Sequence, residues 1–262
     1  MGPDRLDWFA LLLAVVPLAF SFAVFRVFRI GLAKELAVSV IRMSVQLFLV
    51  GLYLTFLFRW DNPLISVGYI LFMVAAANYS VLKNTGLSGK MYGATYPPLA
   101  FSILVVLGWY TVLVFTPTPI YSAKYLIPVA GMLLGNSMRR TIITLERFYS
   151  SIRDDEEGFA SLILYGATVR EAAYPYFRQA YRVGVAPALA GMATIGLVSL
   201  PGMMTGQILG GADPIVAVQY QAVIMLAIFV TTELATLLSV QMSYRRGFGP
   251  TGFFRREIMK AR

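Results

Sequence analysis

Residues 215–242 read IVAVQYQAVIMLAIFVTTELATLLSVQM, a run in which Glu233 is the one charged side chain. About 20 apolar residues are enough to cross the hydrocarbon core of a bilayer as a helix. The run therefore predicts a membrane-spanning helix. The whole chain agrees, because 58% of its 262 residues are hydrophobic and 13% are charged, whereas about a quarter of the residues of a soluble domain are charged.

Six further apolar runs have the length of a span, and turn-forming or charged residues separate them: 8–28, 38–58, 64–82, 97–115, 125–144 and 184–208. The insertion 146–182 is too charged to enter lipid, and the spacing of its apolar residues predicts a helical cytosolic loop. We expect an all-α, polytopic membrane helix bundle with about seven transmembrane helices, forming one domain over residues 1–262. A six-span alternative follows if 64–82 or 97–115 is re-entrant.

The distribution of Lys and Arg predicts the orientation. With the amino terminus outside, the external segments hold Arg5, Arg59 and Lys124, and the other 19 of 22 basic residues lie at or near the cytoplasmic face. Cytoplasmic loops of membrane proteins carry such an excess. Seven spans then place the carboxyl terminus in the cytoplasm. The net charge of +9 is thus attributed to topology, and no nucleic-acid partner is expected, because the basic residues punctuate hydrophobic runs.

Several kinds of chemistry are excluded by residues that the chain lacks. It has no Cys and no His, which removes disulfides, thiolate or imidazole metal sites and His-dependent catalysis. The run nearest to an ATP-binding phosphate loop, residues 86–91 (GLSGKM), has the wrong spacing. We therefore expect no enzyme activity and no cofactor bound by this chain. A directly bound metal would need oxygen or Met ligands.

Polar residues inside spans are costly in lipid and so are candidates for a substrate pathway. Glu233 is the one carboxylate well inside a span, and either a functional role or a structural hydrogen bond accounts for it. Pro201 predicts a kink or break in its span, which suits a gate or mere helix packing. The candidate pathway residues are Arg42, Gln46, Asn78, Asn136, Pro201, Gly202, Met203, Met204 and Glu233.

Three of these residues are predicted to form an inner polar cluster. Counted from the cytoplasmic ends of their spans, Gln46 and Glu233 lie at a similar depth of roughly 12–14 Å. Arg42 lies one helical turn away from Gln46 on the same face. We expect Arg42 to reach Glu233 and to hold it ionised until cargo enters, since charges in low dielectric are found paired.

Four stretches of the chain resemble known transporters. The run 164–172 (LYGATVREA) resembles the segment that permeases of ATP-binding-cassette (ABC) transporters insert into a cleft of their ATPase. The runs 42–47 (RMSVQL), 127–136 (IPVAGMLLGN) and 196–204 (GLVSLPGMM) are similar, in order and spacing, to the FetB-type iron-export permease family and its plant aluminium-tolerance relatives. The resemblance covers about residues 35–242.

The resemblance implies an ABC permease subunit in the cell inner (plasma) membrane that exports iron, another metal ion or its chelate. It implies a homodimer that pairs with two ATPase subunits, which bind the ATP, and it assigns the coupling contact to Gly166, Ala167, Thr168 and Glu171. Ala160 stands where importers often carry an acidic residue, so import is not indicated. The alternatives are an ATPase-independent channel or scaffold, and an ABC permease for an organic or sugar-nucleotide substrate.

Overall fold

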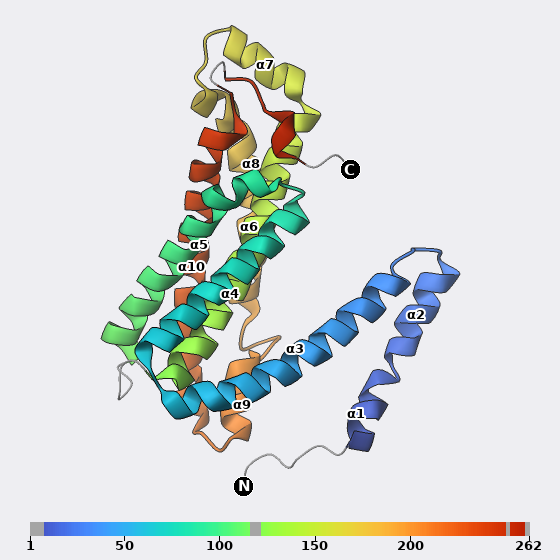
Figure 1. Ribbon diagram of the computed structural model, residues 1–262, viewed down its shortest axis with the longest axis vertical. Coiled ribbons are helices and arrows are strands. Elements are labelled where there is room, and N and C mark those ends of the chain that lie inside the picture. The colour runs from blue at the N-terminus through green and yellow to red at the C-terminus, as the bar shows by residue number, and fades with distance from the viewer. Residues whose placement is uncertain (1–7, 116–121, 250–251, 260–262) are drawn as a thin grey trace.

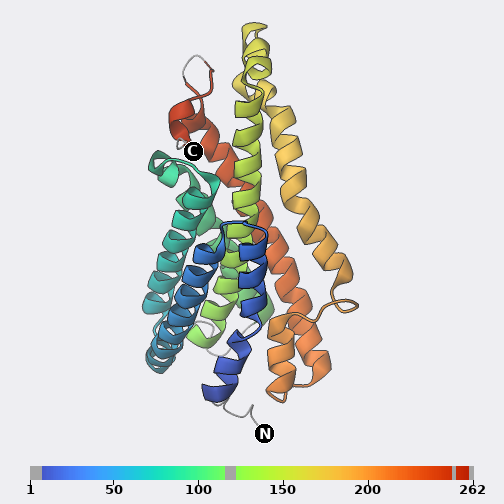
Figure 2. The same ribbon diagram turned by 90° about the vertical axis from the view of Figure 1, so that its right-hand side faces the viewer.

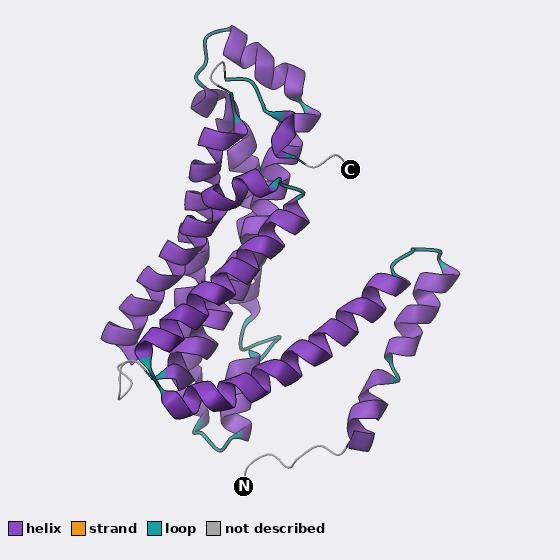
Figure 3. Ribbon diagram, viewed as in Figure 1, coloured by secondary structure: helices purple, strands orange, loops and turns teal. Residues whose placement is uncertain are grey.

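The computed structural model describes residues 8–115, 122–249 and 252–259, and these form helices joined by short loops, with no strand among them (Figures 1 and 3). The all-α prediction is confirmed. The elements are α1 (Trp8–Val15), α2 (Leu18–Val27), α3 (Ala33–Trp60), α4 (Pro63–Thr85), η1 (Gly89–Met91), α5 (Tyr92–Tyr110), the π-helical turn η2 (Thr111–Phe115), α6 (Ala123–Asp154), α7 (Glu156–Leu164), α8 (Val169–Thr194), α9 (Gly202–Leu209), α10 (Pro214–Gly247) and η3 (Arg256–Ile258).

Four helical segments in the described part of the chain are long and apolar enough to cross a membrane: Ala33–Trp60, Pro63–Thr85, Gly89–Val114 and Pro214–Tyr244. They contain the predicted spans 38–58, 64–82 and 215–242 and most of 97–115. The predicted span 125–144 is part of α6, which continues without a break into the charged insertion. The chain is therefore a polytopic helical membrane protein.

Two of the predicted spans are interrupted: 8–28, which was expected to be one helix, and 184–208, in which Pro201 predicted a kink or break. The run 8–28 is divided between α1 and α2 at Val16 and Pro17. The run 184–208 is divided more widely, because α8 ends at Thr194 and α9 begins at Gly202. Proline lacks a backbone N–H and restricts the residue before it, so Pro201 accounts for the non-helical segment that precedes α9. The predicted break at Pro201 is confirmed.

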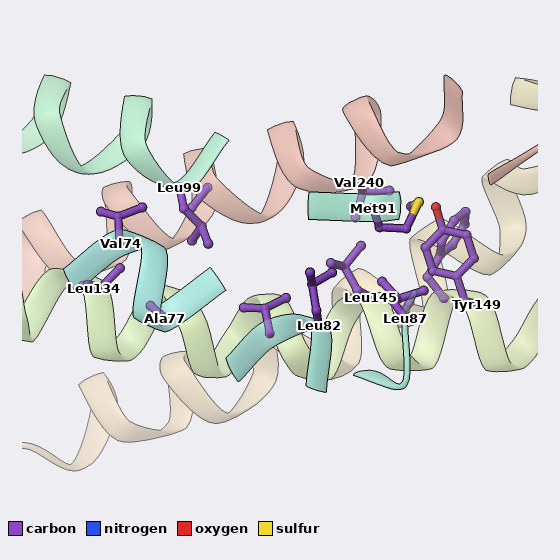
Figure 4. Close-up of a cluster of buried hydrophobic side chains, with 14 of the residues drawn as sticks. Val74, Ala77, Leu82, Leu87, Met91, Leu99, Leu134, Leu145, Tyr149 and Val240 are labelled. Atoms are coloured by element: carbon purple, nitrogen blue, oxygen red, sulfur yellow. The ribbon is translucent and has the colours of Figure 1, made fainter. Parts of the chain in front are cut away.

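Helix α6 is the central element of the bundle. It contacts α4, α5, α8 and α10, and α10 also packs along α5 (Figure 1). The core between them is apolar: Figure 4 shows Leu99 of α5 near Val74 and Leu134 and, further along the bundle, Leu145 of α6 near Val240 of α10. These side chains are fully or almost fully buried. Burial against neighbouring helices, rather than the sequence pattern alone, thus sets the inner face of each span.

Helices α1, α2 and α3 form an arm that leaves the bundle at the α3–α4 turn (Figure 1). At this turn Leu57 is buried against Ala123 and Ile127 of α6. The carboxylate Oδ1 of Asp61 accepts a hydrogen bond from the backbone N–H of Ala123 at 2.7 Å, which satisfies one of the free donors at the start of α6. The turn fixes where the arm departs from the bundle.

Candidate functional site

The interface between α6 and α10 carries a ladder of polar pairs. Ser137 Oγ lies 3.4 Å from Thr232 Oγ1, and one helical turn further Thr141 Oγ1 lies 3.4 Å from Thr236 Oγ1. Both pairs join residues 95 positions apart, as expected of two helices that run in the same direction in register. Polar side chains that pair across helices in this way hold membrane bundles together.

A buried ion pair lies between the two hydroxyl pairs. Arg140 Nη2 of α6 is 2.6 Å from Glu233 Oε1 of α10. The side chain of Arg140 is 4% exposed and that of Glu233 is 24% exposed. The guanidinium also lies over two aromatic rings, 5.0 Å from the ring centroid of Tyr181 and 5.9 Å from that of Phe229, at distances where a cation is attracted to a ring face. The negative charge of Glu233 is thus balanced by Arg140 inside the bundle.

The predicted partner of Glu233 is wrong. The structure pairs Glu233 with Arg140, whereas Arg42 and Gln46 are exposed on α3. Most of α3 belongs to the arm, so the similar depth of Gln46 and Glu233 along their helices does not bring them together (Figure 1). Arg140 was missed as a site residue because it stands near the end of its predicted span. A signal was available: a lone acid in a span calls for a basic partner in a neighbouring one.

A cavity of about 600 Å³ lies beside this ion pair, between α6, α8, α10 and the non-helical segment 195–201. Figure 2 shows the lower end of α8 diverging from α6 and α10 before the chain turns back into α9. Two predicted site residues, Asn136 and Pro201, line the cavity. Its other lining residues are Arg139, Arg140, Ile143, Gly184, Pro187, Ala188, Gly191, Met192, Ile195, Ser199, Met225, Ile228, Phe229 and Thr232.

The segment around Pro201 also borders a second cavity, of about 370 Å³. The two cavities share Met192, Ile195, Pro201 and Met225, and the second is lined by Met204 and Gln221 as well. Both are mainly apolar in their lining. The broken span therefore lies where a binding space is expected in membrane proteins, because non-helical backbone at membrane depth is tolerated where it lines a cavity or is buried in protein.

The other predicted pathway residues lie apart from these cavities. Met203 lines a smaller cavity of about 140 Å³ together with Gln207, and Gly202 is the first residue of α9. Asn78 is fully buried on α4, where its Nδ2 donates to the carbonyl of Tyr92 at 3.5 Å. No group of three or more Asp or Glu side chains suited to a metal ion occurs in the described residues. Of the predicted site residues, Asn136 and Pro201 thus line the larger cavity together with Arg140, and Met204 lines the second cavity. Glu233 lines neither cavity and joins the site through its ion pair with Arg140.

The predicted coupling residues form the turn between α7 and α8. Gly166 follows the end of α7 with φ +94°, a conformation that favours glycine. Thr168 caps α8: its Oγ1 accepts from the backbone N–H of Glu171 at 3.3 Å, and its own N–H donates to Glu171 Oε2 at 2.8 Å. This reciprocal capping box starts α8 at Val169, directly after Thr168.

Hydrogen bonds from the side chain and backbone of Thr168 lower the pKa of Glu171. Because this pKa is lower in the folded protein than in the unfolded chain, the capping contribution is present at neutral pH. It is lost as the pH falls through the lowered pKa. The carboxylate of Glu171 is thus engaged within its own helix start, although it is exposed on the loop.

The turn presents two apolar side chains that sequence reasoning did not single out. Leu164 is 76% exposed and Tyr165 is 90% exposed. Their position directly before Gly166, inside a charged insertion, was the available signal. The turn is nevertheless anchored, since Phe159 of α7 is buried and stacks on Phe248 with ring centroids 5.2 Å apart.

A second contact anchors the turn from α8. Tyr176 Oη donates to Asp155 Oδ2 at 2.7 Å. Burial and this hydrogen bond raise the pKa of Tyr176 to about 12, so the hydroxyl keeps its proton at physiological pH. The exposed apolar tip is therefore displayed on a fixed support at one end of the molecule (Figure 2).

Comparison with known proteins supports a membrane role. Residues 8–248 match the model of the family described as Uncharacterised protein family (UPF0014). The UPF0014 membrane protein YjkA of Bacillus subtilis is 32% identical over 238 residues, covering 91% of this chain and 93% of that protein. The Probable iron export permease protein FetB of Escherichia coli is 27% identical over 237 residues, covering 90% and 89%.

A plant protein is also similar. The protein ALUMINUM SENSITIVE 3 of Arabidopsis thaliana is 34% identical over 197 residues, covering 75% of this chain and 71% of the plant protein. No solved structure matches the chain. The family match covers almost all of the helical chain, including both cavities and the α7–α8 turn. The chain therefore belongs to the UPF0014 family of membrane proteins.

Proposed function

We propose that this chain is the membrane-spanning permease subunit of an ABC transporter that exports iron, another metal ion or its chelate. The observation that carries the proposal is the α7–α8 turn, where Leu164 and Tyr165 are exposed beyond the membrane-length helices on an anchored support. An apolar, preformed tip of this kind suits insertion into a cleft of a partner, because rigid aromatic anchors contribute most to such contacts.

The similarity to an iron export permease supports the cargo class. The relative in Escherichia coli is named a probable iron export permease, and the resemblance of the run 164–172 to the coupling segment of ABC permeases supports an ATPase partner. We infer that the ATPase is a separate subunit and that two copies of this chain pair with two ATPase subunits in the plasma membrane. The permease itself carries out no hydrolysis.

Association with the ATPase tests this proposal. We expect the double substitution Leu164→Asp and Tyr165→Asp to weaken co-purification of the ATPase at least tenfold, about 1.4 kcal/mol, because two carboxylates replace the apolar tip. The matched control is Leu164→Met with Tyr165→Phe, which keeps the tip apolar and should retain the partner. Unchanged ATPase binding by the Asp variant would count against the permease function.

An ATPase-independent channel is distinguished by flux. In inside-out vesicles that hold both subunits, the proposed exporter accumulates iron only while ATP is supplied. The Asp variant of the tip should lose this accumulation and the Met and Phe control should keep it. If the wild type, the Asp variant and the control all carry the same iron flux with and without ATP, the chain is a channel instead.

We further propose seven spans with the amino terminus outside and the carboxyl terminus in the cytoplasm. Because the chain has no native Cys, single Cys residues report their side without background. Ala212→Cys should react with an impermeant maleimide in intact cells, whereas Ser88→Cys and Ser161→Cys should react only after permeabilisation. External labelling at Ser161 would overturn the orientation. Thr118, an equivalent external position, lies outside the described residues.

A further inference from the structure

Arg140 has hydrogen-bonding capacity that the bundle does not use. Its side chain is 4% exposed, and its Nη2 is occupied by Glu233. Its Nε and Nη1 are buried and have no hydrogen-bond partner among the described residues, and neither has Nη2 apart from this ion pair. A buried donor without a partner costs about 1–3 kcal/mol, and more when it is charged. Such a group in a folded protein calls for a ligand, an ion or water.

The guanidinium borders a space large enough for a ligand. Arg140 lines the cavity of about 600 Å³ between α6, α8 and α10, a volume within the range of small-molecule sites, roughly 300–1,000 Å³. Tyr181 and Phe229 pack on the guanidinium, and Glu233 holds one edge of it. The side chain is therefore preoriented, and ligand binding costs little further loss of side-chain conformational entropy.

The charge of the cavity lining favours an anion. Arg139 and Arg140 both line it, no carboxylate does so among the described residues, and Asn136 adds a polar side chain at the same wall. Glu233, which lies outside the lining, balances the charge of Arg140. The cavity and this ion pair together therefore keep one net positive charge, that of Arg139. A cation would enter against this charge. Guanidinium donors instead match the two oxygens of a carboxylate or phosphate.

We propose that this cavity is a binding site for an oxyanion, a small molecule bearing carboxylate or phosphate groups, with Arg140 as its principal ligand and Arg139 as a second positive charge. The inference rests on the proposed function only in treating the bound molecule as cargo. In that case the metal crosses as an anionic chelate and not as a bare cation. The apolar remainder of the lining, including Met192 and Met225, contacts the carbon skeleton of the ligand.

Calorimetric titration of the purified full chain, without ATPase, with citrate and separately with inorganic phosphate tests the site. We expect the wild type to bind at least one of them. Arg140→Gln combined with Glu233→Gln keeps the net charge of the protein but removes the guanidinium donors of Arg140, and should weaken binding at least tenfold. The matched control is Arg153→Gln with Asp154→Asn, which removes a charge pair elsewhere on α6 and should bind like the wild type.

Citrate binding identifies carboxylates as the recognised group, and phosphate binding identifies phosphoryl oxygens. The proposal is overturned if the wild type binds neither anion, or if the Arg140 and Glu233 double variant binds as tightly as the wild type. Because the ATPase is absent, this failure is separate from failure of the permease function, which the tip variants report.

A labelling experiment keeps the test valid if the double variant is unstable. Ser199→Cys places a thiol at the cavity lining, and its reaction with a maleimide should slow at least threefold in saturating citrate or phosphate. Ser161→Cys on α7 is the control and should react at the same rate with and without the anion. If Ser199→Cys reacts at the same rate without anion, with citrate and with phosphate, the proposed site is contradicted.

Discussion

Replacing Glu233 by alanine lowers the thermal midpoint of the detergent-solubilised protein by roughly 6–12 °C. The substitution leaves Arg140, which is 4% exposed, as a buried charge without its carboxylate. Breaking a buried ion pair by removing one partner costs about 3–5 kcal/mol. We take the lower end, about 3 kcal/mol, because Glu233 itself is partly exposed, and about 1 kcal/mol shifts the midpoint by about 2–4 °C in a protein of this size.

The double substitution Arg140→Leu with Glu233→Leu is the control for this prediction. It removes both charges and should recover most of the lost midpoint, since apolar replacement of a buried pair is often neutral or stabilising. A Glu233→Ala variant within 2 °C of the wild type would show that the pair does not support the fold. The role of Glu233 in the substrate pathway stays a prediction, and its pairing with Arg140 has to be included when that role is tested.

Replacing Gly184 by leucine should separate α6 from α8. A Cβ atom at this position would meet Thr144 Oγ1 of α6 at less than a contact distance, and Arg140 Cγ lies 3.5 Å away. Overpacking a well-packed contact costs about 1–3 kcal/mol, and the larger leucine belongs at the upper end. We expect the thermal midpoint to fall by roughly 6–12 °C.

The same substitution at Gly191 is the matched control. Gly191 lies on the same helix, and a Cβ atom there would have nothing within 4 Å. Leucine at this position should leave the midpoint unchanged or raise it slightly, since glycine within a helix is unfavourable by about 0.5–1 kcal/mol relative to alanine. If both variants melt alike, the close contact of Gly184 with Thr144 is not what limits the packing of α8.

Apolar runs and turn residues predicted the helical class and most helix positions. The runs 38–58, 64–82 and 215–242 each lie within one helix, because a bilayer requires a long apolar helix whatever its neighbours are. Gly166 and Thr168 of the α7–α8 turn were singled out through their resemblance to a coupling segment, and the structure shows that Thr168 caps α8 by local backbone chemistry. Proline predicted the break before Gly202. These features depend on residues near one another in the chain.

The composition of the candidate site depended on the tertiary structure. Depth along two separate helices suggested Arg42 and Gln46 as neighbours of Glu233, but depth does not say which helices are adjacent or which faces they turn toward each other. The packing of α6 against α10 in register selects Arg140 instead. The sequence by itself determined a polytopic α-helical membrane chain, because hydrophobicity and the breaks between apolar runs are local properties. The ion pair and the cavity beside it were decided by tertiary packing, which joins residues far apart in the chain.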